Sequence, residues 1–236
     1  MNERQSKLLV TIINQFIHTA IPVGSKKLVE SGIFNCSSAT LRNEMLQLED
    51  EGYLEQPHIS AGRVPSAKGY RAYVQEYMKP SSRQKTVVKQ FETLKAQYFQ
   101  RKDQERVYDA VAMLSQMIPN VAFASVPHKD QVFYLGLANV LRQPEFLADP
   151  RLASGVAEVL EKHLSALLGE VLVDDKVRYY IGEQDVLPQI QSCSLMAIEY
   201  EMRGERGVLG ILGPMRMDYS YNTVALQLAS DLLRSL

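Results

Sequence analysis

The chain has few features of a membrane-spanning or disulfide-rich protein. Only two of its 236 residues are cysteine, Cys36 and Cys193, and neither has another cysteine or a histidine at metal-ligand spacing. This spacing excludes a disulfide framework and a zinc knuckle, so we expect two buried thiols. No apolar run approaches the roughly 20 residues that cross a bilayer, and the N-terminus begins an amphipathic pattern instead of a signal sequence. We therefore expect a cytoplasmic protein.

Excess charge of one sign is also missing. With 26 Lys and Arg against 27 Asp and Glu, the formal net charge is -1. The overall charge therefore does not by itself predict binding to nucleic acid or to a membrane. The 46% hydrophobic content can supply the core of one large domain or two modest ones, which excludes intrinsic disorder. Locally, six basic side chains and a single acidic one lie between Gln56 and Lys85. Such a run is either a solvated face or a phosphate-binding surface.

The first part of the chain predicts three short helices followed by a wing. Apolar residues four apart over 7–19 form one helical stripe, and Ser25 can cap a second helix that stops at Gly32. Ser37 or Ser38 can cap a third helix that ends at Gly52. Residues 53–66 then predict a strand, a polar tip and a short return strand, and 67–78 a further helix.

The rest of the chain predicts helices and an antiparallel sheet. A domain boundary is expected near residue 80, because Pro80 to Ser82 is typical of a linker between domains. Two long helical patterns follow it, up to Pro119. Two more helices, over 156–168 and 224–233, interrupt a series of β-rich runs. These runs are Val121 to Val126, Val132 to Leu137, Val171 to Val173, Val177 to Ile181, Ser194 to Met202 and Val208 to Leu212. Residues 203–207 suit a hairpin connection.

The third predicted helix carries hydrogen-bonding side chains away from its apolar edge. They are Ser37, Ser38, Thr40, Arg42, Asn43 and Gln47. A major groove admits one helix, and the N-terminal residues of that helix reach base edges. Arg42 can bind guanine O6 and N7 together, Asn43 can bind adenine N6 and N7, and the hydroxyl groups suit phosphates or bases. The alternative for this helix alone is an ordinary solvated face.

Cationic and polar side chains flank this helix in the sequence. They are Lys26 and Lys27 before it, and His58, Ser60, Arg63, Lys68 and Arg71 after it. Backbone N–H groups at the start of the preceding helix also favour phosphate. Four elements that can face one duplex therefore carry compatible chemistry, which predicts DNA binding. RNA fits less well because no exposed pair of strand aromatics offers a stacking platform.

Several short motifs in this part of the chain resemble those of a known family. They are Pro22–Ser25, Ser37–Met45, Gly52–His58, Ser60–Arg63 and Lys68–Arg71. The resemblance resumes at Gln143–Phe146, Ile181–Glu183, Ser192–Ser194 and Gly210–Tyr219. On these residues the chain resembles the heat-inducible transcription repressor family, HrcA, over most of its length.

The resemblance implies a bacterial dimeric repressor that binds a long inverted repeat upstream of chaperone operons and releases it when chaperonin is occupied during heat stress. It implies a winged helix-turn-helix joined to a GAF-like domain, which in the family is usually interrupted by a further dimerisation domain. Here only His128, Lys129 and Asp130 separate two predicted strands. We therefore expect the insertion and part of the sheet to be absent.

Together these observations predict an α+β fold with three regions. Residues 1–79 form a winged-helix DNA-binding domain, 80–118 a helical connector, and 119–236 a GAF-like domain for regulation and dimerisation, in which helices back an antiparallel sheet.

The sequence contains few residues that suit a catalytic or metal-binding role. The four histidines lie in unrelated contexts, and His163 falls on an apolar helix stripe that suits a core histidine. Asp174 and Asp175 suit a solvated turn. The run Gly207–Gly213 lacks the lysine and the glycine spacing of a phosphate loop, so close strand packing explains its glycines. No catalytic residue, metal or cofactor is predicted.

The segment Gly213–Tyr219 joins the last predicted strand to the last helix and allows two interpretations. In a structural one, Asp218 caps the helix and Arg216 pairs with a carboxylate. In the other, the segment lines a regulatory pocket of the GAF-like domain.

The leading hypothesis is a sequence-specific DNA-binding repressor that works by occlusion. Bases would be read by Ser38, Thr40, Arg42 and Asn43, and phosphates held by Lys26, Lys27, Arg63, Lys68 and Arg71. Two copies are required because one recognition helix covers only a half-site. The alternative is a winged-helix regulator controlled by a small ligand in the GAF-like domain. An enzyme with a DNA-binding appendage lacks any candidate catalytic set.

Overall fold

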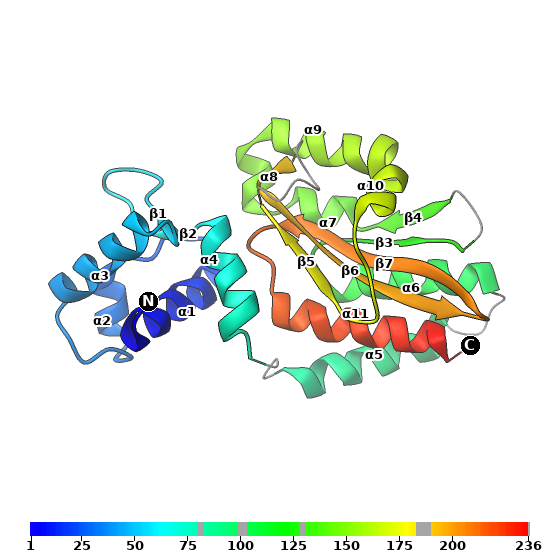
Figure 1. The fold of residues 1–236 in the computed structure, drawn as a ribbon, viewed down its shortest axis with the longest axis horizontal. Helices are drawn as coiled ribbons and strands as arrows, with labels where there is room; N and C mark the ends of the chain where they lie inside the picture. Colours follow the sequence, from blue (N-terminus) through cyan, green and yellow to red (C-terminus); the bar gives the residue numbers. More distant parts are fainter. Residues whose placement is uncertain (80–82, 99–102, 128–130, 183–189, 236) are drawn as a thin grey trace. The chain divides into compact units, whose positions relative to one another are not determined.

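The computed structural model describes residues 1–79, 83–98, 103–127, 131–182 and 190–235. Its contacts divide the chain into two compact units, Met1–Lys79 and Pro80–Leu236, which are described separately below (Figure 1). Within the described ranges, no helix is long and apolar enough to cross a membrane.

The first unit contains short helices and a two-stranded hairpin. Its elements are α1 (Glu3–Thr19), α2 (Ser25–Glu30), α3 (Ser38–Asp50), β1 (Leu54–Glu55), β2 (Val64–Pro65), α4 (Ala67–Ala72) and a π-helical turn (Tyr73–Tyr77). The helix α1 begins earlier than its apolar stripe because Asn2 and Gln5 form a reciprocal capping box at its start. The core comprises Leu8, Leu9, Ile12, Ile13, Leu28, Leu41, Leu48, Leu54 and Tyr70, all at most 1% exposed.

The second unit is built on a five-stranded antiparallel sheet in the order β4-β3-β7-β6-β5 (Figure 1). The strands are β3 (Val121–Ser125), β4 (Val132–Leu135), β5 (Arg178–Ile181), β6 (Cys193–Met202) and β7 (Glu205–Pro214). The long β6–β7 pair turns at Arg203 and Gly204, both with positive φ, which suits the twist of a tight hairpin. The predicted hairpin connection is therefore confirmed.

Helices cover both faces of this sheet (Figure 1). One face packs against α9 (Pro150–Glu158), a π-helical turn (Val159–His163) and α10 (Leu164–Glu170) through a cluster that includes Phe123, Leu195 and Leu212. The other face contacts α6 (Asp103–Met117) and α11 (Tyr219–Arg234), and α5 (Gln84–Tyr98) packs against both of these helices. The sheet thus forms the middle layer of three.

Glycines in β7 allow large side chains to lie against the strand. A Cβ on Gly207 would be 2.6 Å from the ring of Tyr200, and one on Gly210 would collide with the ring of Phe123. Both aromatic residues are fully buried. Close strand packing, as predicted, explains this run of glycines.

Three local expectations were wrong, and two short helices were not predicted. Val171 to Val173 is a loop after α10, in which Val171 is buried against the apolar cluster. His163 is exposed, because it ends a π-helical turn that shifts the apolar stripe. Cys36 is only half-buried, in the turn between α2 and α3. The short helices α7 (Leu137–Leu141) and α8 (Pro144–Ala148) were missed because each has fewer than two turns of periodic pattern. The predicted loop at 128–130 lies outside the described residues.

Candidate nucleic-acid interface

The helix α3 begins at a well-formed cap. The hydroxyl of Ser37 accepts a hydrogen bond from the backbone N–H of Thr40 at 3.1 Å, and the two hydroxyl groups lie 2.9 Å apart. The helix buries Leu41, Met45 and Leu48 on one side. On the opposite side Arg42 and Asn43 are exposed, whereas Ser38 and Thr40 are half-buried. The exposed face therefore presents a guanidinium and an amide near the N-terminal end of the helix.

Two polar contacts fix α3 against α1. Arg4 forms an ion pair with Glu44, whose side chain is only 7% exposed. The hydrogen bond to Glu44 raises the pKa of Arg4 above its usual value. Gln5 donates from Nε2 to Oε1 of Gln47 at 2.9 Å. Sequence reasoning put Gln47 with the free polar side chains, and the structure instead ties it to α1.

The β1–β2 hairpin is held at both its base and its tip. At the base, Val23 and Arg63 exchange two backbone hydrogen bonds of 2.9 Å, and Arg63 Nε lies 2.8 Å from Oε2 of Glu49 in α3. At the tip, residues 58–61, Gln56 donates from Nε2 to the carbonyl groups of Ile59 and Ala61, at 3.0 Å each. These contacts set the hairpin in a fixed position beside α3.

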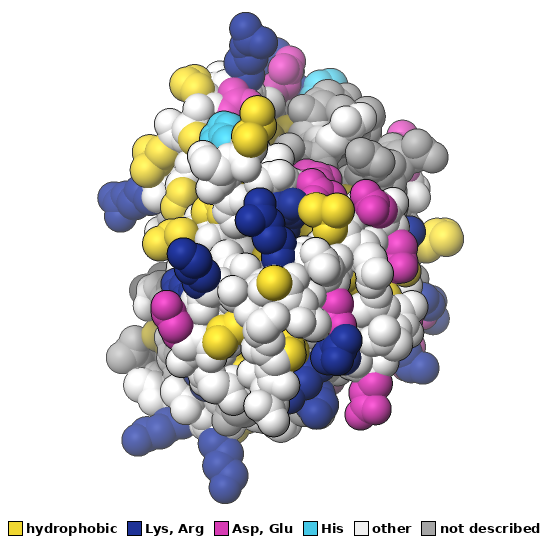
Figure 2. Space-filling model, turned by 90° about the vertical axis from the view of Figure 1, so that its left-hand side faces the viewer, with side chains coloured by type: hydrophobic (Ala, Val, Ile, Leu, Met, Phe, Trp, Pro, Cys, Tyr) yellow, Lys and Arg dark blue, Asp and Glu magenta, His cyan; other side chains and the backbone are white. Residues whose placement is uncertain are grey.

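A cleft of about 280 Å³ lies between the start of α2, α3 and the hairpin. Its lining includes four of the predicted site residues: Lys26, Arg42, Ser60 and Arg63. Figure 2 views the molecule from the side where α2 and α3 lie, and lysine and arginine side chains lie across the middle of this face. The cleft thus brings cationic groups from three elements together around one hollow.

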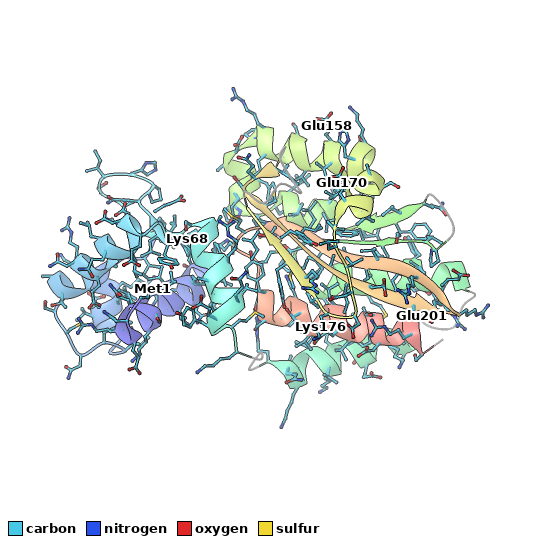
Figure 3. The ribbon with its side chains drawn as sticks, in the orientation of Figure 1. Met1, Lys68, Glu158, Glu170, Lys176 and Glu201 are labelled. Carbon is cyan, nitrogen blue, oxygen red and sulfur yellow. The ribbon has the colours of Figure 1, made fainter. Side chains whose placement is uncertain are left out.

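The other predicted site residues lie outside the lining of this cleft. Lys27 and His58 are exposed, and Arg71 is half-buried in the last turn of α4. Lys68 lies in the first turn of α4 (Figure 3), where Nζ donates to the carbonyl of Glu51 at 2.7 Å and lies 4.4 Å from the centre of the Tyr53 ring. The exposed ammonium of Lys68 is therefore positioned by two contacts of its own.

The cation Arg63 differs from the others because its side chain is largely buried. The residue is 9% exposed, and its guanidinium is engaged by Glu49. Sequence reasoning missed Glu49 and Gln56 as the partners that hold the hairpin. No periodicity or motif signals either contact, since both depend on how the hairpin folds back.

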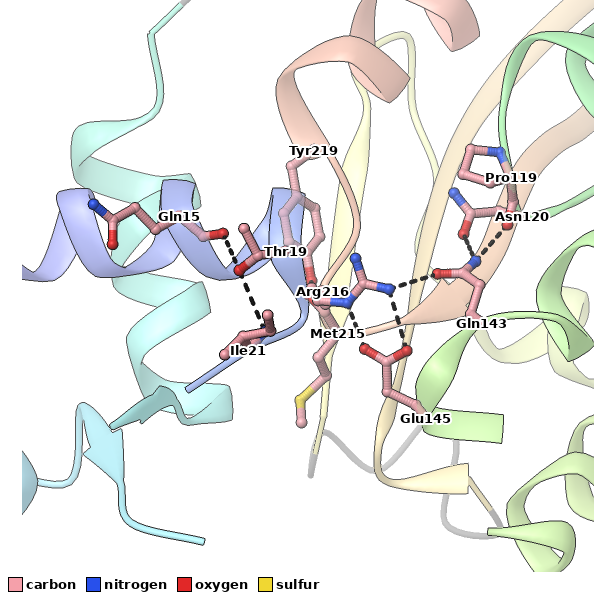
Figure 4. A network of polar contacts seen from close by, with 10 residues as sticks. All are labelled: Gln15, Thr19, Ile21, Pro119, Asn120, Gln143, Glu145, Met215, Arg216 and Tyr219. Carbon is pink, nitrogen blue, oxygen red and sulfur yellow. Dashed lines mark hydrogen bonds and ion pairs between the residues drawn. The ribbon is translucent and has the colours of Figure 1, made fainter. Parts of the chain in front are cut away.

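In the second unit, Gly213–Tyr219 forms a structural junction. Arg216 pairs with Glu145 of α8, with Nε to Oε1 at 2.6 Å, and Gln143 bridges Arg216 to Asn120 at the start of β3 (Figure 4). Asp218 caps α11 by accepting from the N–H of Tyr221. The structural interpretation is therefore confirmed for Arg216 and Asp218.

An open hollow of about 900 Å³ lies elsewhere in the second unit. It is lined by residues 115–117 at the end of α6, together with Ile118, Pro119, the end of β4 and α7. None of residues 213–219 contributes to it. Across the described ranges, no group of three or more His, Cys, Asp or Glu side chains is placed to hold a metal ion.

A family model described as "HrcA protein C terminal domain" matches residues 67–222, which is more than half of the chain. The chain belongs to the HrcA family. Members are transcription repressors, so the chain is a regulator and not an enzyme.

Curated HrcA proteins match this chain, some over its whole length and others over its first part only. A "Heat-inducible transcription repressor HrcA" from Brevibacillus brevis is 27% identical over 335 aligned positions, covering 100% of this chain and 98% of the relative. Because the alignment is longer than the chain, that relative carries residues with no counterpart here. A protein of the same name from Clostridium botulinum is 55% identical over 78 residues, or 33% of this chain.

One solved structure resembles the whole fold. A crystal structure of a protein described only as hypothetical has a TM-score of 0.79 and 17% identity, and the match covers 100% of this chain and 97% of that one. At this identity the likeness concerns the fold alone.

Proposed function

We propose that the chain is a sequence-specific DNA-binding repressor of heat-shock (chaperone) operons, which acts by occupying its operator. The observation that carries this proposal is the cleft, since it groups Lys26, Arg42 and Ser60 beside the exposed face of α3. A helix that presents arginine and asparagine fits a major groove, and the cations around it suit the phosphates that border the groove.

The proposed contacts fall into two classes. Base edges are read from the N-terminal half of α3, by Ser38, Thr40, Arg42 and Asn43. Phosphates and sugars are held by Lys26, Lys27, Ser37, His58, Ser60, Arg63, Lys68 and Arg71. Arg63 reaches DNA only beside its ion pair with Glu49, so its main effect is to position the hairpin. Base contacts supply specificity, and phosphate contacts supply affinity that falls with salt.

The proposed fold assignment divides the chain into three regions. Residues 1–79 act as a winged helix-turn-helix domain in which α2 and α3 form the helix pair and the hairpin forms the wing. Residues 80–118 act as a helical connector, and 119–236 as a GAF-like domain for regulation and dimerisation. Two copies would bind an inverted repeat in the cytoplasm, because each recognition helix covers one half-site. The proposal that chaperonin controls DNA binding rests on the family resemblance alone.

The test is selection of duplexes from random DNA, followed by footprinting at two salt concentrations with the oligomeric state recorded. The proposal expects a palindromic product whose half-sites are protected by a dimer. Enrichment of no sequence, or binding that is equal on all duplexes, would contradict it.

A second candidate is control of DNA affinity by a small ligand, and the open hollow of about 900 Å³ favours it. A metabolite that shifts both the Tm of the purified protein and its DNA affinity would support this candidate, provided that Asn139→Ala in the lining abolishes both shifts. Retention of either shift in that variant would remove the hollow as the ligand site.

A further inference from the structure

The first described residue of the second unit, Arg83, is held by two contacts of its side chain. It forms an ion pair with Asp218, and its guanidinium carbon lies 5.1 Å from the centre of the Tyr221 ring. The hydroxyl of Tyr221 also donates to Oε1 of Gln90 in α5 at 2.8 Å. Arg83 therefore ties the start of α5 to the start of α11.

The carboxylate of Asp218 makes one contact with each of its oxygens. Oδ1 accepts from the N–H of Tyr221 and caps α11, whereas Oδ2 pairs with Arg83. The carbonyl of Arg83 accepts from the N–H of Val87 at 2.9 Å, as the residue before a helix does. Each of the two helices thus begins at a residue that holds the other.

The end of the first unit is also anchored. The π-helical turn Tyr73–Tyr77 is its last helical segment. Oγ of Ser6 in α1 donates to the hydroxyl of Tyr77 at 3.2 Å, and the hydroxyl of Tyr73 donates to Oδ1 of Asn14 at 3.4 Å. Arg83 lies six residues after Tyr77, and a chain of this length spans at most about 20 Å. The two anchors therefore limit how far apart the units can move.

Release of Arg83 would lengthen this connection. Residues 84–86 are exposed, and Val87, which is fully buried, is the next anchored residue of α5. Fraying of this first turn would add four residues to the connection, or about 14 Å of reach. One base pair changes the distance between two half-sites by about 3.4 Å and their relative rotation by about 35°. The added reach exceeds the displacement that one base pair requires.

We propose that Arg83 determines which spacing of half-sites the repressor accepts. With dimerisation in the second unit, the first units of two copies reach their half-sites through two such connections, and Arg83 keeps each connection short. The dimer then discriminates against operators whose half-sites lie too close together or too far apart. Arg83 is a positioning residue, because it acts through the connection without touching DNA. This inference rests on the proposed function.

The experiment measures the affinity of the full chain for the selected operator and for versions with one base pair more or less between the half-sites. Wild type should bind the altered operators about tenfold more weakly, because two anchors of this kind, one in each copy, are together worth about tenfold. Arg83→Ala should reduce this difference to about threefold or less. Asp218→Asn should do the same, since asparagine still caps α11 but carries no charge. Arg83→Lys keeps the charge and should retain most of the wild-type preference.

Arg178→Ala is the matched control. It removes an ion pair of the second unit with Asp174, in which the side chains are 54% and 36% exposed, against 52% and 29% for Arg83 and Asp218. It should keep the wild-type preference for one spacing. Every variant should bind a duplex with a single half-site as wild type does, which a general loss of folding would not allow.

Three results would count against the inference. A full wild-type spacing preference in Arg83→Ala, or an equal loss of preference in Arg83→Ala and Arg178→Ala, would overturn it and leave the proposed function intact. Failure of the wild type to bind any duplex would overturn both.

Discussion

The two units use their polar side chains in different ways. In the second unit, polar groups are engaged within the fold: Arg216 with Glu145, Tyr219 with Ser194 at 2.9 Å, and Ser230 with the carbonyl of Glu199 at 3.1 Å. In the first unit, Arg42, Asn43 and the lysines of α2 are exposed around a cleft.

A difference of this kind is expected between a binding surface and a scaffold, in agreement with the proposed function. Polar groups paired inside the fold stabilise one geometry, whereas exposed groups held on short, well-anchored elements remain available for a ligand. The contacts that do involve polar groups of the first unit, such as Arg63 with Glu49, fix elements around the cleft. Substitutions in the first unit should therefore change binding, and substitutions in the second should change stability.

The largest effect is expected from Arg42→Ala. Loss of a bidentate base contact should cost about 1–3 kcal/mol on the specific operator and little on random DNA. Tm should not change, because Arg42 is exposed. Titrations of both duplexes at one salt concentration measure the difference. An equal loss on the two duplexes would refute the base-reading role.

Glu145→Ala should lower the stability of the second unit, whereas Arg42→Ala lowers operator affinity. It removes Glu145 from the ion pair with the guanidinium of Arg216, which is 13% exposed. Because Glu145 itself is 27% exposed, we expect a loss of about 2 kcal/mol, below the range for fully buried pairs. Thermal unfolding of the second unit should shift down by about 4–8 °C.

The control for Glu145→Ala is Glu158→Ala, which removes an exposed ion pair with Lys162 and should change stability by at most about 0.5 kcal/mol. If both variants unfolded at the same temperature, the junction at Arg216 would not stabilise the unit.

Lys68→Ala should have a smaller and less specific effect. Removal of one phosphate contact should weaken binding to all duplexes alike and reduce the slope of log K against log salt by about one unit. Lys162→Ala, which removes an exposed lysine of the second unit, should leave the slope unchanged. An unchanged slope in Lys68→Ala would remove this residue from the phosphate set.

The two cysteines should differ in reactivity, without any effect on binding or stability. Burial raises the pKa of the Cys193 thiol to about 12, so at pH 8 it is both protonated and inaccessible. Cys36 is half-buried in the turn before α3. A thiol reagent should therefore modify one cysteine in the native protein and two in denaturant. Modification of both in the native protein would show that the second unit opens at this site.

The local features of the site could be predicted from sequence, but most of its support could not. A cap at Ser37, an apolar edge from Leu41 to Leu48 and exposed Arg42 are all encoded within one helix. By contrast, Arg63 meets Glu49, and Gln5 meets Gln47, only after the chain folds back. Charge patterning predicts that Arg63 binds a phosphate, but it gives no sign that the carboxylate of Glu49 pairs with this side chain.

In the second unit, too, local features could be predicted from the sequence, and contacts between distant segments could not. The sequence predicts that Arg216 pairs with a carboxylate, and nothing in the local pattern selects Glu145 in a short helix that itself escaped prediction. Strands were predictable where β-branched and apolar residues run continuously, as in β6 and β7. The same kind of run predicted a strand wrongly at Val171 to Val173, because these apolar side chains pack a loop against the core.

Hydrogen exchange of the full chain with and without its selected operator tests the central claim most directly. The account predicts slower exchange at the start of α2, in α3 and in residues 56–63, with the strands of the second unit unchanged. Protection confined to the second unit, with α3 and the hairpin exchanging as in the free protein, would contradict it.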